Sequence, residues 1–170
     1  MTKFFQTTFF FISVLFLASC SSDDSEGGSS SKNFTLNGET YRVEQAVIQV
    51  FNDSESNTSD ASISLTGSKG GKVASISFSV FYNTSNGIEG VYTSDEDSWD
   101  QIEDTYSSWL SMYSITQNMD MTTSNQPVGP VTIISHGNNQ YTLEFDVTYA
   151  DNVTASASVK TTFAIQSMGF

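Results

Sequence analysis

The sequence predicts an all-β domain over residues 33–170, with an antiparallel β-sandwich of about seven to nine strands as the first interpretation. Apolar and polar residues alternate with period two through most of this region, and Gly- and Asn-rich turns recur at short spacing. No βαβ pattern is present, which argues against a parallel sheet. A small up-and-down, lipocalin-like barrel fits the same observations and stays open as the alternative.

The domain opens with a predicted hairpin. An Asn-Gly dipeptide at 37–38 separates two β-prone segments, residues 33–36 and 39–51, and this dipeptide favours the tight turn that joins two antiparallel strands. In the second segment the apolar positions change from odd to even residue numbers near Gln45. We therefore expect a β-bulge or bend there.

A second hairpin is predicted from strands near residues 61–66 and 72–82, joined by a loop over 67–71. Its second strand alternates apolar residues with serines, which assigns the apolar side chains to the core and the serines to the outer face. A further strand, at about 88–93, follows the Asn-Gly turn at 86–87.

Residues 94–125 carry two competing patterns. Apolar residues from Ile102 to Tyr113 recur at helical spacing, and Ser94 with the acidic residues after it has the character of a helix start. From Trp109 to Ile115, however, the residues alternate as in a strand. We expect a short helix or irregular loop, followed by a strand near residues 107–116.

The last third of the domain predicts an antiparallel meander of three strands, near residues 130–135, 140–149 and 153–165. Gly and Asn residues at 137–139 and an Asp-Asn pair at 151–152 supply the turns between them. The second and third strands each place an apolar residue at almost every second position, so both should contribute one face to the core.

The charge of the chain restricts its partners. It contains 19 acidic and 6 basic residues, for a formal net charge of −13. A surface this negative repels a phosphate backbone, so nucleic acid is not expected as a partner.

Residues 1–19 have the pattern of a secretory leader. Lys3 precedes an apolar segment from about Phe9 to Leu17, which has the length of a signal-peptide h-region and is too short to cross a bilayer as a stable helix. The segment ends in Leu17-Ala18-Ser19-Cys20, and Cys20 is the only cysteine in the chain. A single cysteine excludes an intramolecular disulfide.

This four-residue sequence resembles the lipobox of bacterial lipoproteins. The resemblance implies that residues 1–19 are removed and that Cys20 becomes the first residue of the mature chain, where it carries the lipid, including palmitate. Two or three acyl chains hold a protein stably on a membrane, whereas one alone binds only marginally. A free or buried cysteine after an ordinary signal peptide is the alternative.

Residues 20–32 consist of this cysteine and an acidic Ser- and Gly-rich tether, which contains no large apolar residue and therefore cannot join a core. The Ser-Ser-Asp-Asp sequence at 21–24 resembles the acidic export signal of lipoproteins of the Bacteroidota, which implies a position on the outer membrane, facing the cell exterior. A solvated linker gives the same composition. The domain also resembles small uncharacterised lipoproteins of this group in its first hairpin, in Gly90-Val91-Tyr92 and in Tyr-Thr-Leu at 141–143. This resemblance brings no catalytic residues with it.

Among candidates for chemistry, Glu144 and Asp146 stand two residues apart on one strand, about 6.5 Å along it, and alternation assigns both to its polar face. Paired carboxylates at such a distance serve glycoside hydrolysis. The pair also resembles part of the Glu-x-Asp-x-x-Glu motif of jelly-roll glycosidases, but Tyr149 stands where the third acid is expected. A solvated outer face is the interpretation that we favour for the two acids.

Three further features are weaker. The acidic residues between Asp95 and Asp104, and the oxygen-rich segment that begins at Asp53, suit Ca²⁺ but lack the order of an EF-hand loop. His136, the only histidine, falls in a predicted turn without a nucleophile motif. The aromatic residues Trp99, Tyr106, Trp109 and Tyr113 suit either a sugar-binding platform or core packing.

The sequence therefore predicts a lipid-anchored, surface-exposed protein with a non-catalytic β domain that binds a glycan or another envelope component, or has a structural role. A polysaccharide hydrolase, or an accessory glycan-binding factor, that uses Glu144 and Asp146 is the alternative. Cys20, as the lipidation site, is the one site residue assigned; no catalytic, cofactor-binding or metal-binding residue is.

Overall fold

The computed structural model describes residues 32–52, 57–94, 103–114, 127–149 and 152–169. These residues form an all-β fold, as predicted, and none of them belongs to a helix that could span a bilayer. The strands are β1 (Asn33–Leu36), β2 (Glu39–Asn52), β3 (Thr58–Lys69), β4 (Lys72–Asn83), β5 (Gly90–Ser94), β6 (Thr105–Ser114), β7 (Val131–Ser135), β8 (Gln140–Thr148), β9 (Thr154–Thr162) and β10 (Ala164–Gly169).

The strands close into a barrel of nine strands, so the predicted sandwich is wrong, and of the alternative the closed barrel is confirmed but not its up-and-down strand order. Around the barrel the order is β1-β9-β8-β7-β5-β6-β4-β3-β2, and β1 pairs with β2 to complete the ring. The sequence did not separate the two folds because both require the same alternation of inner and outer residues. What separates them is the long-range pairing of β1 with β9.

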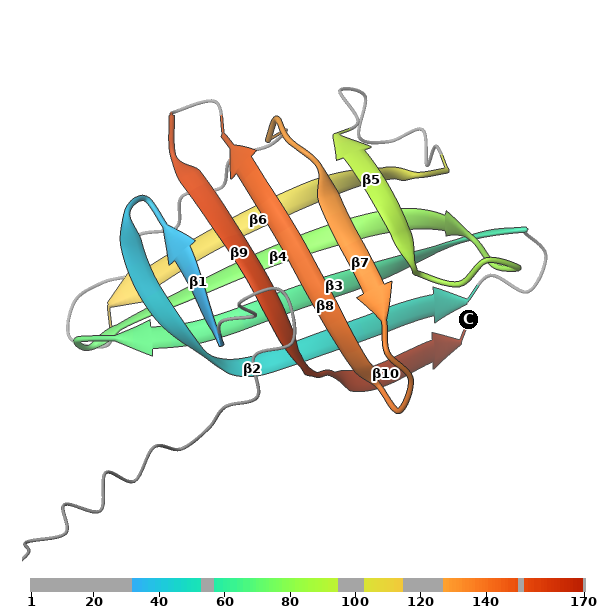
Figure 1. Ribbon diagram of the computed structural model, residues 1–170, viewed down its shortest axis with the longest axis horizontal. Coiled ribbons are helices and arrows are strands. Elements are labelled where there is room, and N and C mark those ends of the chain that lie inside the picture. Colours follow the sequence, from blue (N-terminus) through green and yellow to red (C-terminus); the bar gives the residue numbers. More distant parts are fainter. Residues whose placement is uncertain (1–31, 53–56, 95–102, 115–126, 150–151, 170) are drawn as a thin grey trace, which may run out of the picture.

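Figure 1 shows the barrel as two layers whose strands cross, with β7, β8 and β9 in front of β3, β4 and β6. Strand β2 belongs to both layers because it bends where its register with β3 shifts, between Val43 and Gln45. The predicted bulge is thereby confirmed, and its role is to turn a corner of the barrel. At another corner β9 leads into β10, which runs parallel to β2 from Ala164 beside Val47 onward.

The predicted hairpins are confirmed, with one correction. Asn37 and Gly38 both have positive φ, as a tight two-residue turn requires. The loop predicted over residues 67–71 is shorter, because β3 continues to Lys69 and only Gly70 and Gly71 form the turn. Gly67 is a strand residue that sits beside the bulge of β2, where a Cβ atom would collide with the carbonyl oxygen of Arg42.

The last three predicted strands are confirmed as the meander β7-β8-β9. The strand predicted near residues 107–116 is confirmed as β6, while the helix or loop predicted before it falls largely on residues 95–102, outside the described residues. The order of β5 and β6 was not predicted: β6 lies between β4 and β5 and pairs with β5 in parallel. The barrel is therefore not a simple up-and-down barrel.

Side chains fill the inside of the barrel. Phe78 lies at its centre, with ring centroids 4.9 Å from Phe145 and 5.6 Å from Tyr106. Several interior side chains have 0% exposed surface: Tyr41, Ile48, Leu65, Ile76, Phe78, Val80, Tyr106, Val131, Val147 and Val159. A side chain without accessible surface borders no space large enough for a water molecule, so these residues form a packed core and do not line a ligand cavity.

Candidate functional site

Polar groups inside the barrel serve packing. The Tyr149 hydroxyl lies 2.7 Å from Ser108 Oγ, and Ser108 Oγ donates to the carbonyl oxygen of Ser77 at 2.9 Å. The Tyr106 hydroxyl donates to the carbonyl oxygen of Gly129 at 2.7 Å. Burial raises the pKa of Tyr149 to about 12 and also raises the pKa of Tyr106. Both side chains are neutral hydrogen-bonding groups in a dry core.

Glu144 and Asp146 lie where alternation predicts them, exposed on the outer face of β8. Ser158 on β9 donates a hydrogen bond to Glu144 Oε1 at 3.0 Å, and Asp146 stands opposite Ser156. Tyr149, at the position of the third acid, points into the core with 1% of its surface exposed. The two carboxylates are therefore exposed side chains on one strand, each opposite a serine of β9.

His136 is exposed at the turn between β7 and β8, as predicted. Its Nε2 atom lies 2.8 Å from Thr142 Oγ1, so the ring covers a threonine that is only 7% exposed. The threonine hydroxyl is thus a local hydrogen-bond partner of the ring.

The predicted calcium and aromatic sites fall mostly outside the described residues. The structure does not describe residues 95–102, which include Trp99 and most of the acidic segment, or residues 53–56. The side chains of Trp109 and Tyr113 are not described either. Where it is described, the chain holds no group of three or more His, Cys, Asp or Glu side chains suited to a metal ion. Tyr106 is a core residue, so it takes no part in a surface platform.

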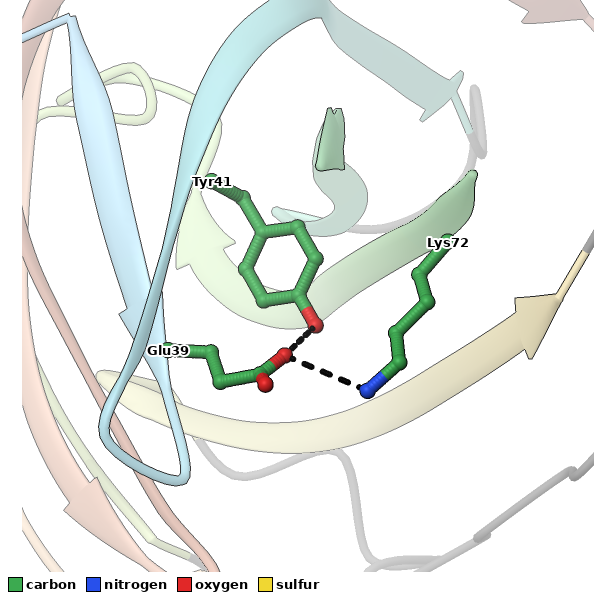
Figure 2. Close-up of polar contacts among 3 residues, drawn as sticks. All are labelled: Glu39, Tyr41 and Lys72. Carbon is green, nitrogen blue, oxygen red and sulfur yellow. Dashed lines mark hydrogen bonds and ion pairs between the residues drawn. The ribbon is translucent and has the colours of Figure 1, made fainter. Parts of the chain in front are cut away.

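A charged cluster that the sequence did not reveal lies at one end of the barrel (Figure 2). Glu39 and Tyr41 are two residues apart on β2, and Lys72 begins β4. The Tyr41 hydroxyl donates to Glu39 Oε2 at 2.9 Å, and Lys72 Nζ lies 3.5 Å from the same oxygen. Figure 2 shows the hydroxyl and the ammonium group converging on this carboxylate.

The contacts of Glu39 define its charge. The hydrogen bond from Tyr41, and then the attraction of Lys72, hold the pKa of Glu39 below its usual value, with a smaller contribution from Lys69. Burial, followed by the bond to Glu39, raises the pKa of Tyr41 to about 12. At neutral pH the cluster therefore holds an ionised carboxylate and a neutral tyrosine beside Lys72.

Other basic residues lie around this cluster. Lys69 pairs with Lys72 across the turn at Gly70-Gly71, and Arg42 stands opposite Ser68, the residue before Lys69. The carbonyl oxygen of Lys32 accepts a hydrogen bond from the backbone N–H of Val43 at 2.8 Å. We call Lys32, Arg42, Lys69 and Lys72 the basic end; Glu39 and Glu44 lie beside them, Glu44 accepting a hydrogen bond from Ser68.

The basic end holds four of the six basic residues of the chain. Sequence reasoning missed it because the residues lie in three separate segments, and only the pairing of β2 with β3 and of β3 with β4 brings them together. The available signal was weak: Lys69 and Lys72 lie in or next to the predicted loop over 67–71, and Lys32 lies at the start of the domain. Cys20, the predicted lipidation site, lies outside the described residues.

Comparisons with protein-family models, with curated proteins and with solved structures find no match to this chain.

Proposed function

We propose that this chain is a lipid-anchored protein of the bacterial outer membrane that faces the cell exterior, and that its barrel has a non-catalytic binding or structural role there. The proposal for the anchor rests on Leu17-Ala18-Ser19-Cys20, the apolar segment before it and the polar tether after it. Lipid on Cys20 keeps a domain with a polar outer face beside a membrane.

The observation that supports a non-catalytic role is the filled interior of the barrel. Larger or emptier barrels hold small ligands in their interior, but in this barrel side chains occupy that space. A partner would therefore bind to the outer face or to the loops. A glycan or another envelope protein is the class of partner we propose for those surfaces. The exposed position of Glu144 and Asp146 on a strand surface speaks against the hydrolase alternative.

A Cys20→Ala variant tests the anchor. We expect the wild-type protein to incorporate labelled palmitate and to stay with the membrane fraction, and the variant to lose both properties because it lacks the thiol that forms the thioether. Ser21→Ala is the matched control, since it changes the neighbouring residue and keeps the thiol. Membrane association and label that persist in Cys20→Ala would overturn the proposal.

Position and catalysis need separate measurements. Protease treatment of intact cells should remove the barrel if it faces the exterior and spare it if it faces the periplasm. A Glu144→Gln/Asp146→Asn double variant should keep any glycan binding of the wild type. A hydrolytic activity present in the wild type and absent from this variant would replace the non-catalytic role with the hydrolase.

A further inference from the structure

We infer that the basic end of the barrel docks on the anionic phosphate headgroups of the membrane that carries the protein, so that the opposite end faces away from the lipid. This inference rests on the proposed function, because it takes the membrane to be the one in which Cys20 is anchored. It adds an orientation and a second contact, made by named side chains of the folded domain.

The basic end carries a local positive charge. Lys32, Arg42 and Lys69 are exposed, and the Lys72 side chain is 50% exposed although it lies near Glu39. With Glu39 and Glu44 beside them, the four cations leave this end positive in a chain whose net charge is −13. Basic side chains near an anionic membrane surface gain about fivefold in partitioning per cation. The rest of the molecule is repelled by the same surface, so the attraction selects one orientation.

Charge is distributed unevenly along the barrel. Strand β3 runs from Asp60, near one end, to Lys69 at the other, and nine residues of strand correspond to roughly 30 Å. Glu103 and Asp104 lie at the Asp60 end, since the N–H of Asp104 donates to the carbonyl oxygen of Phe81, which pairs with Asp60. The barrel therefore has a positive end and a negative end, and the two respond oppositely to an anionic surface.

The chain enters the barrel at the basic end. Residues 20–31 connect Cys20 to Lys32, which is itself part of the basic end. Twelve residues reach at most about 40 Å even when fully extended, which is about five Debye lengths at physiological salt. An anchor at Cys20 thus holds the basic end closer to the headgroups than it holds the acidic end. Charge and attachment favour the same orientation.

The only thiol of the chain allows a direct test. The chain from Cys20 to Phe170 contains every strand of the closed barrel and its core, and a maleimide-bearing lipid in a preformed vesicle couples to Cys20 alone. Vesicles of phosphatidylglycerol with phosphatidylcholine provide the anionic surface, and vesicles of phosphatidylcholine the neutral one. The rate at which an N-hydroxysuccinimide ester acetylates each lysine, followed by mass spectrometry, reports which side faces the lipid.

We expect Lys69 and Lys72 to react at least fivefold more slowly on anionic than on neutral vesicles. About 0.5 M salt should remove the difference. A Lys32→Gln/Arg42→Gln variant keeps both reporter lysines and should lose most of their protection, whereas Glu103→Gln, at the opposite end, should keep all of it. Equal rates on the two vesicles, or full protection in the Lys32→Gln/Arg42→Gln variant, would overturn the inference.

This test is independent of the one for the anchor, because the lipid is attached chemically. If cells leave Cys20 unmodified, the proposed function fails whatever the vesicles show. If Lys69 and Lys72 gain no protection, the docking inference fails and the anchor stands.

Discussion

Two tyrosines that point inward meet opposite environments at the middle and at the basic end of the barrel. Tyr149 is 1% exposed, and its hydroxyl lies 2.7 Å from Ser108 Oγ in the core. Tyr41 is 0% exposed, but its hydroxyl reaches Glu39 at the barrel end, where Lys72 approaches the same oxygen. One hydroxyl belongs to a neutral hydrogen-bonded chain, and the other belongs to a charged cluster.

The difference shows how the molecule divides its tasks. Ser108 uses its one hydroxyl proton toward the Ser77 carbonyl, so Tyr149 is the donor to Ser108 and the buried groups satisfy one another without charge. At the basic end the carboxylate of Glu39 is ionised and the cations around it stay exposed. The middle therefore consists of neutral, mutually satisfied groups, and the end presents exposed charges.

The largest effect should come from the middle. Replacing Phe78 by Ala removes the ring that contacts Phe145 and Tyr106 and leaves a cavity, so we expect a loss of about 3–5 kcal/mol in the free energy of unfolding. Denaturation in urea measures it. Ile165→Ala on β10, where the side chain is 39% exposed, is the matched control and should cost less than about 1 kcal/mol. Similar costs at the two positions would mean that the interior is not close-packed.

An intermediate effect should distinguish the two tyrosines at alkaline pH. Tyr149 and Tyr41 both have a pKa raised to about 12 in the folded protein, against about 10 in an unfolded chain. The unfolded chain therefore loses these protons first, so the stabilisation is complete below about pH 10 and is lost as the pH rises through about 12. Tyr149→Phe and Tyr41→Phe should each cost about 1 kcal/mol at neutral pH and flatten the alkaline decline.

Salt separates the two variants. The raised pKa of Tyr41 depends partly on the negative charge of Glu39, whereas that of Tyr149 follows from burial. Unfolding free energies measured from pH 8 to 12 should therefore show a smaller Tyr41→Phe effect in about 1 M salt and an unchanged Tyr149→Phe effect. An equal response to salt would contradict the contrast between a charged end and a neutral middle.

The sequence predicted local structure better than global structure. Alternation and turn dipeptides located every strand except β10 as a separate element, and even the bulge of β2 was visible as a change of phase near Gln45. These features depend on neighbouring residues, which a single sequence displays. Closure of the barrel depends on the pairing of β1 with β9, about 120 residues apart in the chain, and no local pattern encodes that contact.

The candidate site residues show the same difference between local features, which the sequence predicted, and long-range contacts, which it did not. The outer position of Glu144 and Asp146 came directly from strand alternation. Gly67 was wrongly predicted to belong to the turn. Glycine occurs both in turns and where two backbones approach closely, and the sequence alone does not distinguish these two roles. The basic end was invisible because Arg42 and Lys69 become neighbours only through strand register.

The smallest effect on stability should come from the ion pair that most clearly marks the basic end. Lys72 Nζ and Glu39 Oε2 are 3.5 Å apart, with side chains 50% and 43% exposed, so Lys72→Gln should leave the free energy of unfolding almost unchanged, because water screens an exposed ion pair. The pKa of Glu39, followed by NMR, should rise in this variant yet stay below its usual value, because the larger cause, the hydrogen bond from Tyr41, remains. Lys160→Gln should leave that pKa unchanged. If Lys72→Gln markedly lowers the free energy of unfolding, Lys72 contributes to folding. If the pKa of Glu39 does not change in this variant, Lys72 does not interact with Glu39. Either result would contradict the contrast between a stabilising middle and a charged end.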